Sequence, residues 1–125
     1  MAMTQEFILD TLLPYKENPK LCGYDYKNEE CCYLTKDGKK CAVGKHMKEG
    51  PWQNYSNSFE ELIESYTPEE FLTDEAFEQN IPTYVWQAMQ EYHDFLATDS
   101  IKDTINDKVN FIEKETGFDL SPLKF

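Results

Sequence analysis

The sequence predicts an α+β fold, a mainly helical single domain over residues 1–125 with one β-hairpin near residues 31–43. Two stretches, 83–97 and 101–116, repeat apolar residues at the spacing of an amphipathic helix. A Lys36-Asp37-Gly38 turn signal lies between two short strand-like runs. With 125 residues, of which 40% are hydrophobic, the chain is long enough for one core but not for two.

The N-terminal part predicts one helix followed by a loop. Residues 4–13 place three apolar side chains on one helical stripe, namely Phe7, Ile8 and Leu12. Pro14 lacks the backbone N–H that a helix interior uses, so we expect the helix to end there. Residues 15–29 are polar and rich in tyrosine, with Asn18-Pro19 and Gly23, which is typical of a loop.

Two capping-box patterns predict short helices in the middle of the chain. Ser58 is followed three residues later by Glu61. Thr67 is followed in the same way by Glu70, with Pro68 at the first helical position. In the first of these helices the residues expected to face inward are Phe59, Leu62 and Ile63.

The two longest helices are expected at 83–97 and 101–116. The buried face of the first comprises Val85, Ala88, Met89, Tyr92 and Leu96. The apolar stripe of the second comprises Ile101, Ile105, Val109 and Ile112. Ser100, with Asp103 three residues on, is the expected N-cap of the second helix, and Gly117 before Phe118 predicts its left-handed C-terminal stop.

The stretch CCYLTKDGKKCAVGKHM, residues 31–47, holds three of the four cysteines and one of the two histidines. Gly38 fits the left-handed position of a three-residue loop, and in that register Tyr33 lies opposite Cys41. A four-residue loop would instead place Cys32 opposite Cys41. In either register two sulfur atoms come within reach of each other.

Four roles are open to these cysteines. A zinc site could draw its ligands from Cys22, Cys31 or Cys32, Cys41 and His46, but the close C-x₂₋₄-C spacing of a zinc knuckle is missing. Cys41 with His93 could form a catalytic thiol pair, since such pairs are usually distant in sequence. A disulfide is disfavoured in the cytosol, and free cysteine commonly packs as a small hydrophobe. We therefore predict no metal, no cofactor and no catalytic residue, with a zinc- or thiol-dependent enzyme as an alternative.

Charge is distributed unevenly along the chain. All 12 basic residues are lysine, and residues 49–101 contain none of them but carry twelve Asp or Glu. Such a field disfavours direct contact with nucleic acid and favours a partner protein with a basic surface or a cation. The residues expected to form this partner-binding surface, called here the acidic surface, are Glu60, Glu61, Glu64, Glu69, Glu70, Asp74, Glu75 and Glu78.

A second possible function is binding of a small phosphorylated ligand, such as a nucleotide signal. Its pocket would lie between the hairpin and the helix that carries Trp86 and His93. The expected lining is Tyr33, Cys41, Lys45, Trp86 and His93, with lysines contacting the phosphate. Asp94 directly follows His93, and neighbouring residues point apart on a helix, so we expect no contact between their side chains.

Short motifs carry a family resemblance that extends over residues 5–120. They are Cys31-Cys32-Tyr33, Asp37-Gly38, Cys41-Ala42-Val43-Gly44, Met89-Gln90-Glu91-Tyr92-His93-Asp94 and Glu115-Thr116-Gly117-Phe118. This pattern resembles small proteins of tailed bacteriophages and prophages that carry a C-x-Y-R-x-x-D-G-x-x-C-A-x-G segment and a Q-x-x-H-D helix. Leu34 stands where that group has arginine, and Lys45-His46 where it has a cysteine and an aliphatic residue.

The resemblance implies a phage or prophage origin and an accessory role in the cytoplasm of a bacterial host. No apolar run reaches the roughly 18 residues that span a bilayer, and the N-terminus lacks the layout of a signal peptide, so we expect no membrane association. The sequence thus favours a phage-encoded counter-defence protein that binds and inhibits a host defence or regulatory factor through its acidic surface.

Overall fold

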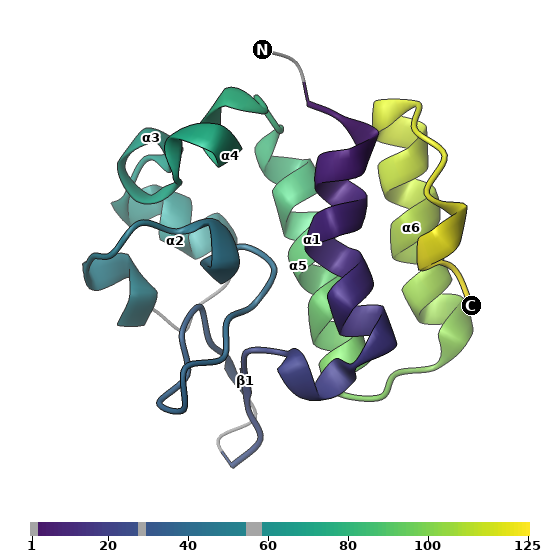
Figure 1. Cartoon of the computed structure of the whole chain (residues 1–125), viewed down its shortest axis with the longest axis horizontal. Coiled ribbons are helices and arrows are strands. Elements are labelled where there is room, and N and C mark those ends of the chain that lie inside the picture. Colours follow the sequence, from purple (N-terminus) through teal and green to yellow (C-terminus); the bar gives the residue numbers. More distant parts are fainter. Residues whose placement is uncertain (1–2, 28–29, 55–58) are drawn as a thin grey trace.

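Three long helices lie side by side, and a group of short elements packs along one flank of them (Figure 1). The structure is a computed structural model that describes residues 3–27, 30–54 and 59–125, with Glu30 and Cys31 described by their backbone alone. The long helices are α1 (Gln5–Glu17), α5 (Thr83–Ala97) and α6 (Lys102–Thr116). The other elements are η1 (Pro19–Leu21), β1 (Tyr24–Asp25), β2 (Glu30–Cys31), η2 (Gly44–His46), η3 (Pro51–Asn54), α2 (Phe59–Ser65), α3 (Pro68–Phe71), α4 (Asp74–Glu78) and η4 (Ser121–Leu123). The prediction of a mainly helical fold is confirmed.

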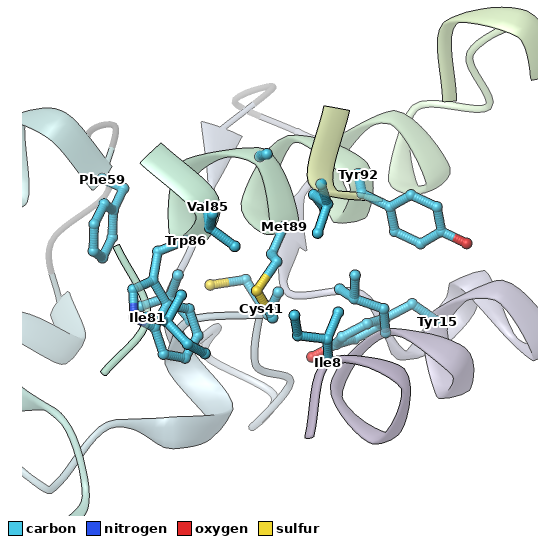
Figure 2. Packing of buried hydrophobic residues seen from close by; sticks show 14 of the residues in the cluster. Ile8, Tyr15, Cys41, Phe59, Ile81, Val85, Trp86, Met89 and Tyr92 are labelled. Carbon is cyan, nitrogen blue, oxygen red and sulfur yellow. The ribbon is translucent and has the colours of Figure 1, made fainter. Parts of the chain in front are cut away.

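Helix α5 is the centre of the core and has the bounds that its periodicity predicts. All five residues of its predicted apolar face are buried. It packs against α1, α2 and α6. In Figure 2, Phe59 lies next to Trp86 at one end of this core, Ile8 and Tyr15 face Met89 from α1, and Tyr92 lies at the other end. A central helix buried on several sides fits the broad apolar stripe of its sequence.

Helix α1 continues one turn beyond its predicted end, with Pro14 inside it. Thr4 caps its N-terminus, where the hydroxyl accepts a hydrogen bond from the Phe7 backbone N–H at 3.2 Å. The additional turn buries Tyr15, which is 2% exposed and donates from its hydroxyl to the Lys40 carbonyl at 2.6 Å. The prediction that Pro14 ends the helix was wrong because burial of this aromatic side chain offsets the backbone cost of proline.

The loop expected over residues 15–29 also contains η1 and β1. Strand β1 pairs with β2 in antiparallel register, with Tyr24 opposite Cys31. Each strand is only two residues long, so the sheet contributes little to the fold. The β pairing therefore lies earlier in the chain than the predicted hairpin near residues 31–43.

The turn of that hairpin is confirmed, but its strands are not. Gly38 has φ +86°, and its N–H donates to the Thr35 carbonyl at 3.0 Å. The Thr35 N–H donates in turn to the Lys39 carbonyl at 2.8 Å, which closes the predicted three-residue loop. Beyond Lys39 the chain winds instead of extending, since the Lys45 N–H donates to the Cys41 carbonyl and η2 follows.

Gly23 explains why the two sides of the turn do not pair with each other. The Cys32 N–H donates to the Gly23 carbonyl at 3.0 Å. A Cβ atom at Gly23 would lie 2.5 Å from the Cys41 nitrogen and 2.8 Å from the Cys32 carbonyl oxygen. The backbone at Gly23 thus passes between the two segments that the predicted hairpin would have joined, and only glycine fits there.

The short helices are defined by their caps. The Thr67 capping box is complete, with both the hydroxyl of Thr67 and the carboxylate of Glu70 in place. The Thr73 hydroxyl accepts from the Ala76 N–H and caps α4. The predicted cap Ser58 lies outside the described residues. Phe59 and Leu62 are buried as expected, whereas Ile63 is half-buried.

The start of α6 differs from its prediction. Its N-cap residue is Ile101, whose side chain is 71% exposed. Ser100 instead closes the turn that follows α5, because its N–H donates to the Phe95 carbonyl at 2.9 Å and its hydroxyl lies 3.1 Å from that of Thr98. The predicted Ser100 cap and the inward position of Ile101 were therefore wrong. Ile105, Val109 and Ile112 are buried, and Gly117 has the predicted left-handed conformation.

The C-terminal residues are tied to α1, α5 and α6. The Lys16 ammonium donates to the carbonyls of Pro122 and Lys124, each at 2.8 Å. The buried Tyr92 hydroxyl donates to the Leu123 carbonyl at 2.8 Å. Leu120 and Leu123 are fully buried, so this segment completes the core. In the described ranges, every helix is too short or too polar to cross a lipid bilayer.

Candidate functional site

The residues of the predicted ligand pocket lie in the core. Tyr33 and Trp86 are 1% exposed, and Cys41 and His93 are fully buried. Lys45 is half-buried, and its ammonium donates to the Thr11 carbonyl at 2.7 Å and lies 4.4 Å from the centre of the Tyr15 ring. These side chains pack against other parts of the chain, and the three pockets described below are lined by other residues.

His93 is held at both ring nitrogens. Its Nε2 accepts a hydrogen bond from the Gly23 N–H at 3.0 Å, so the proton of the neutral ring is assigned to Nδ1. Nδ1 lies 2.8 Å from a carboxylate oxygen of Asp94. The expectation that Asp94 points away from His93 was therefore wrong. The Gln90 amide donates to the same carboxylate at 3.0 Å, which holds the Asp94 side chain over this face of α5.

This arrangement connects the core helix to the irregular segments on both sides. The side-chain oxygen of Gln90 accepts from the Val43 N–H at 3.2 Å, and Nε2 of His93 accepts from the Gly23 N–H. Both ring nitrogens of His93 are thus occupied by structural partners. The geometry gives this histidine a positioning role in the fold, and Cys41 is not its hydrogen-bond partner among the described contacts.

Cys22 and Cys41 are buried free thiols. Burial, with a smaller contribution from Asp94, raises the pKa of the Cys22 thiol to about 12. The sulfur of Cys41 accepts from the Gly44 N–H at 3.3 Å. Cys22, Cys32 and Cys41 form no disulfide, and the side chain of Cys31 lies outside the described residues. A neutral buried thiol is a poor nucleophile, which argues for the packing role of Cys22.

The candidate zinc ligands do not gather in the described part of the chain. No three side chains of the types His, Cys, Asp and Glu come together there as a metal ion would require. His46 donates from Nε2 to the Thr11 hydroxyl at 2.9 Å, because that hydroxyl itself donates to the Phe7 carbonyl. Burial and the nearby Lys45 ammonium lower the pKa of His46 to about 4, so the ring is neutral at pH 7.

Three pockets open on the surface, and two of them adjoin neither α2 nor α6. One, of about 300 Å³, lies between α1 and α4 and includes His46 together with the carboxylates of Glu6, Asp10 and Glu75. The other, of about 600 Å³, lies beside β1 and includes the lysines and carboxylates of residues 25–27 and 36–37. The second pocket is lined by both lysines and carboxylates, whose charges oppose each other. It therefore offers no net positive field that would attract an anion.

The eight residues of the acidic surface lie on three short helices that follow one another along the chain. All eight are exposed and belong to α2, α3 and α4. Asp74 lies 3.7 Å from the Lys48 ammonium, in a pair whose carboxylate is 93% exposed. Such an exposed pair neutralises little charge. With no lysine from residue 49 to residue 101, the field of these three helices is strongly negative.

A groove of about 250 Å³ adjoins this surface between α2, α5 and α6. Its apolar lining consists of Phe59, Ile63, Tyr84, Ala88 and Phe111. Its polar lining includes Glu60, Gln87, Glu91 and Lys108. Tyr84 and Phe111 are 50% and 40% exposed, and their rings meet edge to face with centroids 6.4 Å apart. The Lys108 ammonium lies 3.2 Å from the Glu91 carboxylate.

This groove is absent from the sequence-based predictions. Its aromatic residues, Tyr84 and Phe111, lie outside the apolar stripes of α5 and α6, where side chains are expected to meet water. Two aromatic residues in such positions are the signal that could have indicated it. Only the packing of α5 against α6 brings the two rings together, and residues 27 positions apart give no local pattern.

No protein-family model, curated protein or solved structure matches this chain.

Proposed function

We propose that this chain is a phage-encoded accessory protein that binds and inhibits a host defence or regulatory factor in the bacterial cytoplasm. The observation that carries the proposal is the acidic surface, whose eight carboxylates are all exposed on consecutive elements. The phage origin is supported by the motif resemblance. The partner is expected to present a basic surface, because charge complementarity speeds association and excludes acidic partners.

The acidic surface is built on well-fixed elements. The Thr67 capping box and the Thr73 cap define the starts of α3 and α4. The Lys48 N–H donates to the Phe71 carbonyl at 2.8 Å and the Thr73 N–H to the His46 carbonyl at 2.8 Å, which ties these helices to the core. The backbone that carries these carboxylates is therefore ordered before binding, so association does not include the cost of folding this segment.

Inhibition follows from competition for the same basic surface. A basic surface on a bacterial regulator or defence factor commonly contacts nucleic acid phosphates. An acidic protein that covers this surface prevents that contact without an enzymatic step. Because exposed charges are screened by salt, the association rate should fall as ionic strength rises.

The proposal is tested with a charge-reversal variant and a control that carries the same change in net charge. The surface variant has Glu61→Lys, Glu64→Lys, Glu69→Lys and Glu78→Lys. The control variant has Glu17→Lys, Asp103→Lys, Asp107→Lys and Glu115→Lys, all at exposed positions outside the acidic surface. Each protein is immobilised and exposed to a bacterial lysate at low and high salt, and the retained proteins are quantified and purified.

For a purified partner, we expect the surface variant to bind at least about tenfold more weakly than the wild type, and the control variant to bind as the wild type does. The wild type should also inhibit the partner's nucleic acid binding or enzymatic activity. Equal affinity for all three proteins, an affinity independent of salt, or binding without inhibition would overturn the proposal.

A further inference from the structure

The groove between α2, α5 and α6 shares a wall with the acidic surface. Glu60 belongs to both, and Glu64 follows it by one helical turn on the same side of α2. The groove therefore adjoins the α2 part of the acidic surface. A partner that contacts Glu60 and Glu64 lies beside the opening of the groove.

The groove has the size and lining of a pocket for a protein side chain. Its volume of about 250 Å³ lies below the roughly 300–1,000 Å³ of pockets that enclose small-molecule ligands. The edge-to-face pair of Tyr84 and Phe111 leaves two aromatic rings substantially exposed to water on one wall. Exposed aromatic surface beside charged groups is typical of protein interfaces, where a few buried anchors supply most of the binding energy.

The polar groups of the groove indicate the charge of its occupant. Glu91 is paired with Lys108, which leaves Glu60 and the nearby Glu64 to set a negative field at the α2 side. The side-chain oxygen of Gln87 is buried and has no hydrogen-bond partner among the described residues. A hydrogen-bond donor from the occupant would satisfy this acceptor, whose isolation is otherwise costly. Both features favour a partner segment that brings positive charge and hydrogen-bond donors beside the group that enters the groove.

We propose that this groove holds one apolar side chain from a basic segment of the partner protein, flanked by Lys or Arg residues that contact Glu60 and Glu64. This inference rests on the proposed function, since it assigns the anchor point of the same interface. The apolar side chain packs between Phe111, Tyr84 and Ile63. Glu60 and Glu64 favour a basic segment over a neutral or acidic one. The shape of the groove then distinguishes among basic segments by the apolar side chain that they carry.

The test uses three labelled synthetic peptides of equal length. One is an amphipathic helix of Lys and Leu, the second replaces every Leu with Gln, and the third replaces every Lys with Glu. Binding is measured by fluorescence anisotropy at low and high salt. The wild type is compared with the groove variants Phe111→Ser and Tyr84→Ser and with the control Phe77→Ser, whose side chain is 44% exposed on α4 outside the groove.

We expect the Lys/Leu peptide to bind the wild type at least about tenfold more tightly than the Lys/Gln peptide. Each groove variant should remove most of this difference and leave the affinity for the Lys/Gln peptide unchanged. The Phe77→Ser control should retain the difference. All of the altered side chains are substantially exposed, and circular dichroism of each variant verifies its fold.

The two proposals fail in different ways. If neither basic peptide binds more tightly than the Glu/Leu peptide, the acidic surface is not a site for basic partners and the proposed function fails. If both basic peptides bind equally, or if Phe77→Ser and Phe111→Ser have the same effect, only the groove assignment fails. If sedimentation shows that the wild type self-associates and Phe111→Ser abolishes this, the occupant is a second copy of the chain and the inference is overturned.

Discussion

His93 and His46 differ in burial and in the groups that they contact. His93 is completely buried, accepts from the Gly23 N–H and contacts Asp94 through its other nitrogen. His46 is half-buried, donates to the Thr11 hydroxyl, and its ring lies 4.6 Å from that of Phe7. The first ring positions backbone segments, and the second couples the fold to pH.

Replacing His93 tests its positioning role. His93→Ala would leave the Gly23 N–H without its acceptor and would remove the edge-to-face contact with Tyr15 at 4.7 Å. We expect the free energy of unfolding to fall by about 3 kcal/mol. Asp94→Asn, whose amide oxygen can still accept from the ring, should cost about 1 kcal/mol. Urea denaturation measures both, and a loss below about 1 kcal/mol for His93→Ala would contradict the assignment.

The lowered pKa of His46 predicts a loss of stability in acid. The pKa of the ring is about 6.5 in the unfolded chain and about 4 in the folded protein. As the pH falls from about 6.5 to about 4, the unfolded chain therefore takes up the proton first and becomes favoured. The difference corresponds to about 3 kcal/mol, present in full above pH 6.5.

His46→Gln isolates this contribution, since glutamine can still donate to the Thr11 hydroxyl but does not titrate. Denaturation of both proteins across the pH range should give curves that converge as the pH falls toward 4. Parallel curves would show that His46 does not titrate differently in the two states. The other acid-sensitive groups are common to both proteins and cancel in the comparison.

At the scale of elements, local patterns predicted what local interactions determine. The bounds of α5, the Thr67 capping box and the stop at Gly117 follow from residues within a few positions of one another. The continuation of α1 through Pro14 depends on Tyr15 reaching the Lys40 carbonyl, and the missing strands depend on Gly23 passing between two later segments. Such contacts between distant residues leave no period or motif in a single sequence.

Two glycine substitutions distinguish the cost of a left-handed backbone conformation from the cost of a steric clash with a neighbouring backbone segment. Gly38 has a left-handed φ but open space around it, so Gly38→Ala should cost only about 1 kcal/mol. Gly23→Ala would place a methyl group against the backbone of Cys41 and Cys32. It would also displace the backbone N–H that donates a hydrogen bond to His93. We expect a loss of at least about 3 kcal/mol. Equal losses in chemical denaturation would refute the interdigitated arrangement around Gly23.

At the scale of the whole molecule, the charge that defines the acidic surface also acts against folding. The net charge is −12, and residues 49–101 supply twelve carboxylates without a lysine. Repulsion among them is greater in the compact state than in the unfolded chain, and salt screens it. The sequence alone predicted this distribution, because charge is a property of composition, but it did not predict the groove that adjoins it.

Salt should therefore stabilise the protein. Between about 20 and 300 mM NaCl we expect the free energy of unfolding to rise by on the order of 1 kcal/mol. A variant with Glu61→Gln, Glu64→Gln, Glu69→Gln and Glu78→Gln should show a smaller rise and a higher stability at low salt. Thermal denaturation followed by circular dichroism measures this. A stability that falls with salt would show that attractive ion pairs dominate instead.

The attachment of the C-terminal residues to Lys16 has a consequence for synthesis on the ribosome. The Lys16 ammonium contacts carbonyls that lie 106 and 108 residues further along the chain. Because synthesis proceeds from the N-terminus, helix α1 emerges from the ribosome 106 residues before the first of these partners. Until residues 120–123 follow, the surface of α1 and the Tyr92 hydroxyl that this segment contacts stay open to solvent or to chaperones. The core around α1 therefore closes only after a long intervening stretch has been synthesised.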